Sequence, residues 1–265
     1  MEIIIKQDYD QICEEAVKII YQAWKRKNNL VLGLPTGKTP LEMYKKLIEL
    51  NEKGIMDFSQ IATFSLDEYL GLKEDHPLSF ASYMEKNFFQ HVNVKKENIF
   101  RLDGTPENIE DHCRAYEEKI KNLGGIDIQI LGIGRNGHIG FNEPSSSLSS
   151  RTRVKTLTLE TIKANSVLFK NNNEIPRYCL TMGIGTIMES KMIILLASGR
   201  EKSEAVSRCV EGPVTSSIPA SILQLHSQAK IIIDQEASSL LRNKEYYQWV
   251  YKNKEKVDDF LEKKK

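Results

Sequence analysis

A short stretch between an apolar run and a helical pattern has the composition of an anion-binding turn. It reads GLPTGKTP over residues 33–40, so hydroxyl side chains and one cation flank a glycine. A turn that opens a helix directs backbone N–H groups and the positive end of the helix dipole at an anion, commonly a phosphate. The candidates for phosphate binding are therefore Thr36, Gly37, Lys38 and Thr39. An ordinary connection between a strand and a helix is the alternative.

Two adjacent carboxylates, Asp67 and Glu68, directly follow the apolar run 61–66. A carboxylate at the end of a strand can serve as a general base in sugar chemistry. Side chains of adjacent residues in an extended chain point to opposite sides, so we expect only one of the two to face a site. An acidic helix cap or a solvated turn is the alternative for this pair.

A histidine and a glutamate share the glycine-rich segment LGIGRNGHIGFNEP, residues 131–144. An imidazole near a carboxylate is suited to proton transfer at neutral pH. The glycines let the backbone and His138 come close to a ligand, with Glu143 as the neighbouring acid. The spacing G-x-G-x-x-G also matches a dinucleotide fingerprint, but that motif opens a helix, and Gly140 and Pro144 disfavour one here. A purely structural histidine is left open.

The segment 145–157 is rich in hydroxyl and basic side chains, with Arg151, Arg153 and Lys155 among five serines and two threonines. Such side chains suit a second phosphate group, although a solvated basic loop has the same composition. The remaining histidines and the four cysteines show no metal-ligand spacing. We therefore expect neither a catalytic metal nor another cofactor.

These segments alternate with patterns that predict a layered α/β fold. Unbroken apolar runs predict strands at 29–35, 61–66, 126–134, 191–198 and 229–234. Helical periodicity predicts helices at 8–27, 41–50, 79–89, 106–123, 159–169, 200–210 and from about 245 onward. Apolar strands separated by helices are typical of an open, mostly parallel, doubly wound sheet with helices on both faces. We expect one domain over residues 1–265, with an irregular loop at roughly 138–157 near the carboxyl ends of the strands.

The composition narrows the class of protein. Among 265 residues, 37 Lys and Arg stand against 36 Asp and Glu, which gives a net charge of +1. A near-neutral chain argues against a general binder of nucleic acid or of membrane surfaces. No apolar run approaches the length of about 18 residues needed to span a membrane, and the N-terminus does not read as a signal peptide. Scattered cysteines fit a reducing compartment, so we expect a cytoplasmic protein.

Two phosphate-binding candidates, a strand-end acid and a histidine–acid loop together indicate chemistry on a phosphosugar. Proton transfer between neighbouring carbons, an aldose–ketose shift, requires such groups and neither a metal nor a redox cofactor. The segments LGLPTGKTP, FSLDEYLGL, LGIGRNGHIGFNEPSSSLSSRTRVKTL, CLTMGIGTI and LQLH also occur in this order along nearly the whole chain. In combination they resemble the glucosamine-6-phosphate deaminase family.

The resemblance implies a modified Rossmann-like fold and the conversion of glucosamine 6-phosphate and water to fructose 6-phosphate and ammonia. Position by position, Asp67 matches the acid that moves a proton between C2 and C1. His138 matches the base that opens the sugar ring, and Glu143 matches its acidic partner. The turn Thr36–Thr39 and Lys202, which follows the apolar run 191–198, match contacts to the substrate phosphate.

Three positions depart from the family pattern. Asn136 stands where many members have Asp, and we keep it among the catalytic candidates because its amide can hold the imidazole ring. Lys38 replaces the second glycine of the phosphate turn, and its side chain is expected to point to solvent. Val167 replaces an arginine that contacts the substrate phosphate, which predicts weaker substrate binding unless Lys170 compensates from the next helical turn.

Some members of the family are hexamers that N-acetylglucosamine 6-phosphate activates at a subunit interface. The residues of that effector site match Ser146, Arg153, Lys155 and Thr156. We therefore expect an allosteric phosphosugar site and a homo-oligomer, a hexamer by resemblance. Tyr246 or Tyr247 is expected to supply an aromatic contact from the C-terminal helix.

Three alternative functions remain. A 6-phosphogluconolactonase-like hydrolase shares this fold type but requires no carbon base at Asp67. A phosphosugar-sensing regulator would need a DNA-binding segment, and no basic helix-turn-helix of sufficient length is visible. A P-loop nucleotidase needs four residues between its glycines, whereas three separate Gly33 from Gly37.

Overall fold

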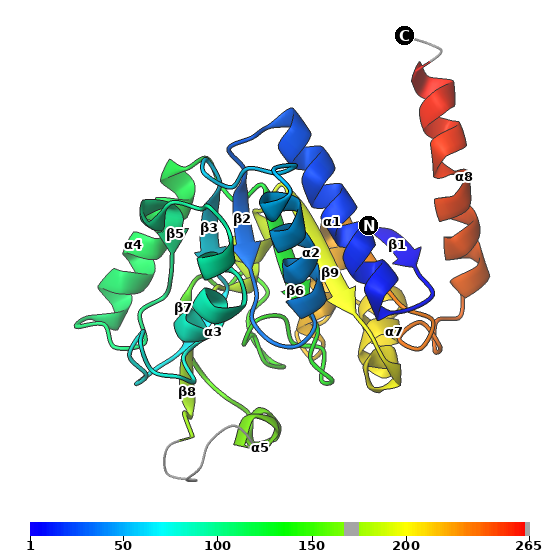
Figure 1. Ribbon diagram of the computed structural model, residues 1–265. Coiled ribbons are helices and arrows are strands. Elements are labelled where there is room, and N and C mark those ends of the chain that lie inside the picture. Colours follow the sequence, from blue (N-terminus) through cyan, green and yellow to red (C-terminus); the bar gives the residue numbers. More distant parts are fainter. Residues whose placement is uncertain (167–174, 263–265) are drawn as a thin grey trace.

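A seven-stranded sheet forms the centre of the molecule (Figure 1). The computed structural model describes residues 1–166 and 175–262, without the side chains of 164–166 and 255–262. The strand order is β1-β10-β9-β6-β2-β3-β5, and every neighbouring pair is parallel. The strands of this sheet are β1 (Glu2–Ile5), β2 (Val31–Leu34), β3 (Ala62–Ser65), β5 (Ile99–Phe100), β6 (Ile128–Gly132), β9 (Met192–Ala197) and β10 (Ala229–Ile233).

Helices cover both faces of the sheet because its strands are apolar on both sides. The described helices are α1 (Tyr9–Arg26), α2 (Leu41–Glu52), α3 (Phe80–Asn87), α4 (Ile109–Asn122), α5 (Leu159–Ser166), α6 (Ile184–Met188), α7 (Ser203–Glu211) and α8 (Lys244–Glu262). Helices α1 to α3 share one apolar cluster with Leu196, whereas α4, α6 and α7 share the other with Leu195. The predicted doubly wound α/β fold is therefore confirmed.

A second, smaller sheet was not expected from the sequence. It is antiparallel in the order β4-β8-β7, with β4 (Asp67–Tyr69), β8 (Tyr178–Thr181) and β7 (Arg153–Thr156). Strand β7 lies within the segment 138–157, so the expectation of an irregular loop there was wrong at its carboxyl end. These strands have three or four residues, and β7 alternates between half-buried and exposed positions, so no apolar run marks it. The edge strands β1 and β5 were missed for the same reason, since they are short.

The small sheet is attached to the carboxyl edge of the large one. Leu66 is the single residue between β3 and β4, and the N–H of Met182 donates a 2.8 Å hydrogen bond to its carbonyl. Asp67, the first residue of β4, pairs with Thr181 on β8. The chain therefore turns out of the large sheet at the position where the sequence places its adjacent acids.

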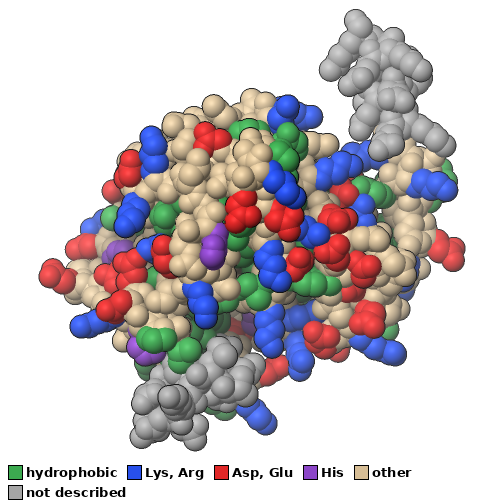
Figure 2. Space-filling view, in the orientation of Figure 1, with side chains coloured by type: hydrophobic (Ala, Val, Ile, Leu, Met, Phe, Trp, Pro, Cys, Tyr) green, Lys and Arg blue, Asp and Glu red, His purple; other side chains and the backbone are tan. Residues whose placement is uncertain are grey.

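Helix α8, predicted from about residue 245, begins at Lys244 and lies beside the edge strand β1 (Figure 1). Lys254 forms an ion pair with Glu2 of β1, 2.7 Å between Nζ and Oε1. Among the described residues, no helix has the length and hydropathy of a membrane span. Acidic and basic side chains are interspersed over the face shown in Figure 2, as the near-zero net charge suggests.

Candidate active site

The candidate residues follow four adjacent strands of the large sheet. Strands β9, β6, β2 and β3 lie side by side and run parallel, so their carboxyl ends share one edge. Lys202 follows β9, the His138 loop follows β6, the turn 36–39 follows β2, and Asp67 follows β3. Open α/β sheets bind ligands at this edge. The tertiary structure therefore brings together segments that lie up to 166 residues apart, from Thr36 to Lys202.

The turn 36–39 presents free backbone donors. Within the described chain, no residue accepts a hydrogen bond from the N–H groups of Thr36, Gly37, Lys38 or Thr39. Gly37 has φ +98°, a left-handed conformation that favours glycine, whereas Lys38 needs no such conformation. Lys38 is exposed, as expected for a residue that replaces a glycine of the family pattern. The turn offers several unpaired N–H groups and one cation to an anion.

Asp67 is buried without a hydrogen-bond donor. Its side chain is 7% exposed, and no described residue donates to its carboxyl group. Burial, and secondly the charge of Glu68, raise the pKa of Asp67 to about 8. The nearby phenol of Tyr116 donates its hydrogen to the carbonyl of Ser65 at 2.6 Å, so it is not available to the carboxyl group. A carboxyl group whose pKa is close to neutral can both accept and return a proton.

Glu68 points the other way and caps a helix. Its carboxylate accepts hydrogen bonds from the N–H groups of Phe80 at 3.0 Å and Ala81 at 2.9 Å, in the first turn of α3. It also accepts one from Tyr69 at 2.8 Å. The alternative of an acidic helix cap therefore describes Glu68, and Asp67 remains the acid that is free for chemistry. This division agrees with the opposite orientations expected of adjacent residues.

Glu143 contacts both His138 and Asn136 in the loop that follows β6. Its Oε2 lies 3.4 Å from Nδ1 of His138 and accepts a 2.7 Å hydrogen bond from the amide of Asn136. Burial opposes ionisation, but His138 and the hydrogen bonds from Thr161 and Asn136 outweigh it and lower the pKa of Glu143 to about 2. The carboxylate is therefore charged throughout the neutral range, where its negative charge faces Nδ1 of the imidazole.

Asn136 acts differently from the expectation. Its Oδ1 accepts a 3.2 Å hydrogen bond from the backbone N–H of His138, and its amide donates to Glu143. The side chain thus braces the loop and the carboxylate, rather than the imidazole ring. An amide at this position supplies a donor to Glu143, which an aspartate could not do in its charged form.

Glycine at position 134 allows the imidazole to lie against the backbone. A Cβ atom there would come within 2.3–2.5 Å of three ring atoms of His138. The N–H of Gly134 also donates to the carbonyl of His138 at 2.9 Å, which closes the loop. In this structure the glycine at 134 allows the His138 ring to pack against the backbone, whereas the predicted close approach of the motif to a ligand remains a prediction.

Two threonines of the site were missed by the sequence analysis. Oε1 of Glu143 accepts hydrogen bonds from the hydroxyls of Thr161 at 2.5 Å and Thr158 at 3.3 Å. Thr161 lies in α5 and Thr158 immediately precedes that helix. Threonines before and inside a helix are common, so nothing in the sequence distinguishes these two from ordinary capping residues.

Lys202 reaches the same edge. Its Nζ donates a 2.9 Å hydrogen bond to the carbonyl of Ile133, next to the His138 loop. Burial, together with the positive charge of Arg135, lowers the pKa of Lys202, although Glu201 opposes this. Val167 and Lys170, the remaining candidates for phosphate contact, lie outside the described residues.

The effector-site candidates border the histidine loop. Ser146 is buried, and its hydroxyl donates to the carbonyl of Glu143 at 2.6 Å. Arg153 donates to Oδ1 of Asn142 at 3.0 Å. Lys155 and Thr156 follow on β7, where Thr156 is exposed. Two of the four candidates thus bond directly to the segment that carries Glu143.

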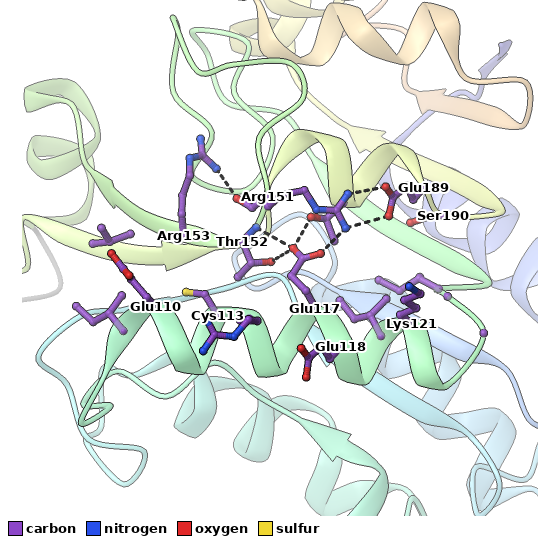
Figure 3. Close-up of a pocket in the computed structure, with 18 residues that line it drawn as sticks. Glu110, Cys113, Glu117, Glu118, Lys121, Arg151, Thr152, Arg153, Glu189 and Ser190 are labelled. Atoms are coloured by element: carbon purple, nitrogen blue, oxygen red, sulfur yellow. Dashed lines mark hydrogen bonds and ion pairs between the residues drawn. The ribbon is translucent and has the colours of Figure 1, made fainter.

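A half-open groove of about 750 Å³ lies between α4, β7 and α6 (Figure 3), and neither Asp67 nor Glu143 is among its lining residues. Figure 3 shows Arg151, Thr152 and Glu117 meeting on its wall. Glu117 accepts hydrogen bonds from the N–H of Thr152 at 2.8 Å and the hydroxyl of Thr186 at 2.5 Å. Among the described residues, Arg151 and Arg153 of the segment 145–157 line this groove, and neither Asp67, His138 nor Glu143 does. The groove is therefore separate from the proton-transfer groups.

Comparison with known proteins identifies relatives over most of the chain. Residues 6–233 match the family of glucosamine-6-phosphate isomerases and 6-phosphogluconolactonases. A glucosamine-6-phosphate deaminase of Thermoanaerobacter sp. (strain X514) is 52% identical over 241 residues, 91% of this chain and 95% of the relative. A protein of the same name from Shewanella halifaxensis is 46% identical over 257 residues, 97% of this chain and 98% of the relative. The resemblance inferred from the motifs is confirmed.

Solved structures share the fold. A monomeric glucosamine-6-phosphate deaminase superposes with a TM-score of 0.88 at 45% identity, covering 91% of this chain and all of that one. The 6-phosphogluconolactonase of Leishmania guyanensis superposes with a TM-score of 0.70 at 21% identity, over 89% of this chain and 97% of that one. The second likeness concerns the fold alone.

Proposed function

The chain belongs to the family of glucosamine-6-phosphate isomerases and 6-phosphogluconolactonases, and we propose that it converts glucosamine 6-phosphate and water to fructose 6-phosphate and ammonia. Relatives at 46–52% identity carry the name of this deaminase. The observation that carries the proposal is the buried Asp67, which receives no hydrogen bond from the described residues. It stands at one sheet edge with a turn whose N–H groups have no acceptor among the same residues. A carbon base is required for an aldose–ketose shift and not for hydrolysis of a lactone.

The free N–H groups of the turn 36–39 bind the substrate phosphate in this proposal, with Lys38 and Lys202 as cations. His138 opens the sugar ring: a proton leaves the hydroxyl at C1 and one is delivered to the ring oxygen. Glu143, whose Oε2 lies 3.4 Å from Nδ1 of His138, orients the imidazole. Asn136 contributes by holding Glu143 and the backbone of the loop.

Asp67 then carries out the isomerisation. Its carboxylate removes the proton from C2 of the open chain and returns it to C1, while a proton of the amino group passes to the C1 oxygen, which leaves a hydroxyl at C1 and an imine at C2. Water adds to that imine and ammonia leaves, so fructose 6-phosphate is the second product. A pKa of about 8 suits both halves of this transfer, because the group accepts the proton and releases it again at neutral pH.

The proposal includes regulation of the activity by a phosphosugar effector. We propose that N-acetylglucosamine 6-phosphate activates the enzyme through Ser146, Arg153, Lys155 and Thr156. The bonds from Ser146 to Glu143 and from Arg153 to Asn142 support this, because they connect the effector residues with the histidine loop. An effector that shifts the loop would change the geometry at Glu143. A flat response of activity to the effector, at sub-saturating substrate, would contradict this part.

Assembly and location complete the proposal. We propose a homo-oligomer, up to a hexamer, whose partner subunit completes the effector site. Tyr246 is exposed and available for such a contact, whereas the hydroxyl of Tyr247 donates to Glu211 at 3.2 Å. Light scattering tests this directly, because a monomeric relative of known structure makes a monomer the opposing outcome. Four free, buried cysteines support a cytoplasmic location.

The experiment that tests the function measures ammonia and fructose 6-phosphate released from glucosamine 6-phosphate, without added metal. The wild type should release the two products in equal amounts, and Asp67→Asn should release almost none. A second assay offers 6-phosphogluconolactone. Hydrolysis of the lactone by both proteins, without ammonia release from the amino sugar, would replace the deaminase by the hydrolase.

A further inference from the structure

Three tyrosine hydroxyls hold the carbonyl side of the phosphate turn. Tyr83 of α3 donates to the carbonyl of Gly37 at 2.5 Å, and Tyr44 of α2 donates to that of Pro35 at 2.6 Å. The hydroxyl of Tyr9, the first residue of α1, lies 3.0 Å from the carbonyls of both Lys38 and Thr39. Three helices thus contact one short turn. No sequence motif marks these tyrosines as part of a site.

We propose that Tyr9 and Tyr83, supported by Tyr44, are positioning residues that aim the N–H groups of the turn at the substrate phosphate. This inference rests on the proposed function and names residues that no contact with substrate would reveal. The tyrosines act through the backbone, on the opposite side of the turn from the ligand.

The planar peptide unit connects each of these carbonyls to one N–H group of the turn. In a planar trans peptide, the carbonyl of one residue and the N–H of the next point in opposite directions. A hydroxyl that fixes the carbonyl of Gly37 therefore fixes the N–H of Lys38 on the other side. Holding the carbonyl of Lys38 does the same for the N–H of Thr39, and holding that of Pro35 does so for Thr36. The N–H groups fixed in this way are among those without an acceptor in the described chain.

The turn requires such support because its own composition favours flexibility. Gly37 is exposed at φ +98°, and Lys38 is exposed beside it. Ordering a loop on ligand binding costs conformational entropy, so a turn already held in its binding form binds more tightly. The tyrosines belong to helices, and Tyr44 is fully buried. Their hydrogen bonds therefore hold the exposed turn against helices that pack on the core.

The hydroxyls remain donors at working pH. Burial raises the pKa of Tyr9 to about 12 and that of Tyr83 still further, so neither phenol ionises near neutrality. The Tyr9 hydroxyl also accepts a 3.2 Å hydrogen bond from the N–H of Glu42, which fixes it against the start of α2. Its hydrogen is thereby directed at the turn.

The test removes single hydroxyls. Tyr83→Phe, Tyr9→Phe and the double variant are compared with the wild type and with Tyr21→Phe, a control on α1 whose hydroxyl has no hydrogen-bond partner within the described chain. Each lost hydrogen bond should raise KM for glucosamine 6-phosphate about 3- to 10-fold, with kcat changed less than about 2-fold. The control should leave both constants unchanged. Tyr44 is omitted because its complete burial makes loss of folding a competing result.

A titration with inorganic phosphate separates this inference from the proposed function. Amide NMR signals of Lys38 and Thr39 should shift on addition of phosphate to the wild type, and the apparent Kd should rise about 3- to 10-fold in each variant. Weakened phosphate binding in variants of a protein without deaminase activity would retain the inference and reject the function. A lowered Tm with unchanged KM and Kd would show that the tyrosines only stabilise the fold, and would overturn it. Absence of phosphate binding to the wild type would overturn both.

Discussion

Asp67 and Glu143 are both buried, at 7% and 1% exposure, yet their pKa values are shifted in opposite directions. Asp67 has Glu68 as its charged neighbour and receives no hydrogen bond from the described residues. Glu143 receives hydrogen bonds from Thr161 and Asn136 and faces His138. Its pKa falls to about 2, while that of Asp67 rises to about 8.

Burial alone therefore does not decide what a carboxyl group does in this protein. The donors around it decide, because each hydrogen bond to the charged form offsets part of the cost of removing it from water. One region produces an acid that exchanges protons near neutrality, and the other a permanent negative charge. The two properties correspond to the carbon base and to the orienting partner of the proposed reaction.

The largest expected effect comes from removing the exchangeable proton. Asp67→Asn keeps the shape of the side chain but cannot accept a proton from carbon. We expect kcat to fall about 10²- to 10⁴-fold with KM nearly unchanged, because the amide still fills the same space. Steady-state kinetics with ammonia detection measure both constants. A loss below 10-fold would mean that another group is the base.

Removing the permanent charge should cost less. Glu143→Gln keeps the size of the side chain and removes the negative charge that faces His138. We expect kcat to fall about 10- to 100-fold, as for other groups that act through a neighbouring catalytic residue. Pre-steady-state measurement of ring opening locates the defect. A wild-type rate of ring opening would contradict the partner role.

The pH dependence of activity separates the two acids. If Asp67 must be ionised to act as a base, kcat/KM should rise with pH up to about 8 in the free enzyme. Glu143, whose pKa is about 2, should add no step within the usual assay range. Measurement of kcat/KM at pH values between about 5 and 9 tests this expectation. If kcat/KM does not rise as the pH approaches about 8, the raised pKa of Asp67 is refuted.

The same acids should affect stability with opposite signs. The pKa of Asp67 is raised from 3.8, so its contribution to stability is complete below pH 3.8 and is lost as pH rises through about 8. The pKa of Glu143 is lowered from 4.5, so its contribution is present above pH 4.5 and is lost as pH falls through about 2. Asp67→Asn should therefore raise Tm at pH 8 relative to the wild type and change it little at pH 4. Equal Tm differences at both pH values would contradict this linkage.

The smallest effect is expected for a donor to Glu143. Thr161→Val removes the 2.5 Å hydrogen bond but keeps the volume, and Thr161→Ser restores the hydroxyl. One hydrogen bond to a charged group contributes about 1.5–3 kcal/mol, of which Thr158 can recover part. We expect kcat to fall about 3- to 10-fold in the valine variant, with rescue by serine. An unrescued loss would indicate a packing defect instead.

Part of this architecture could be predicted from the sequence. The central strands are apolar runs, and their order along the chain with helices between them predicted a parallel sheet. The alternation of side chains in an extended strand predicted that Asp67 and Glu68 point to opposite sides. It did not predict which of the two faces the site. Strands β4, β7 and β8 could not be found, because three or four residues of mixed polarity carry no periodic signal.

The sequence by itself determined which chemical groups the site contains. Glycines at 134 and 37, the histidine, and the adjacent acids occupy fixed local positions, and local geometry explains why those residue types stand there. The tertiary structure alone decided the charge of each acid and the orientation of the turn. Donors such as Thr161 and Tyr83 come from 18 and 46 residues away, since hydrogen bonds depend on atoms that folding brings together. A pKa or a backbone orientation set in this way is a property of the fold, and no local pattern records it.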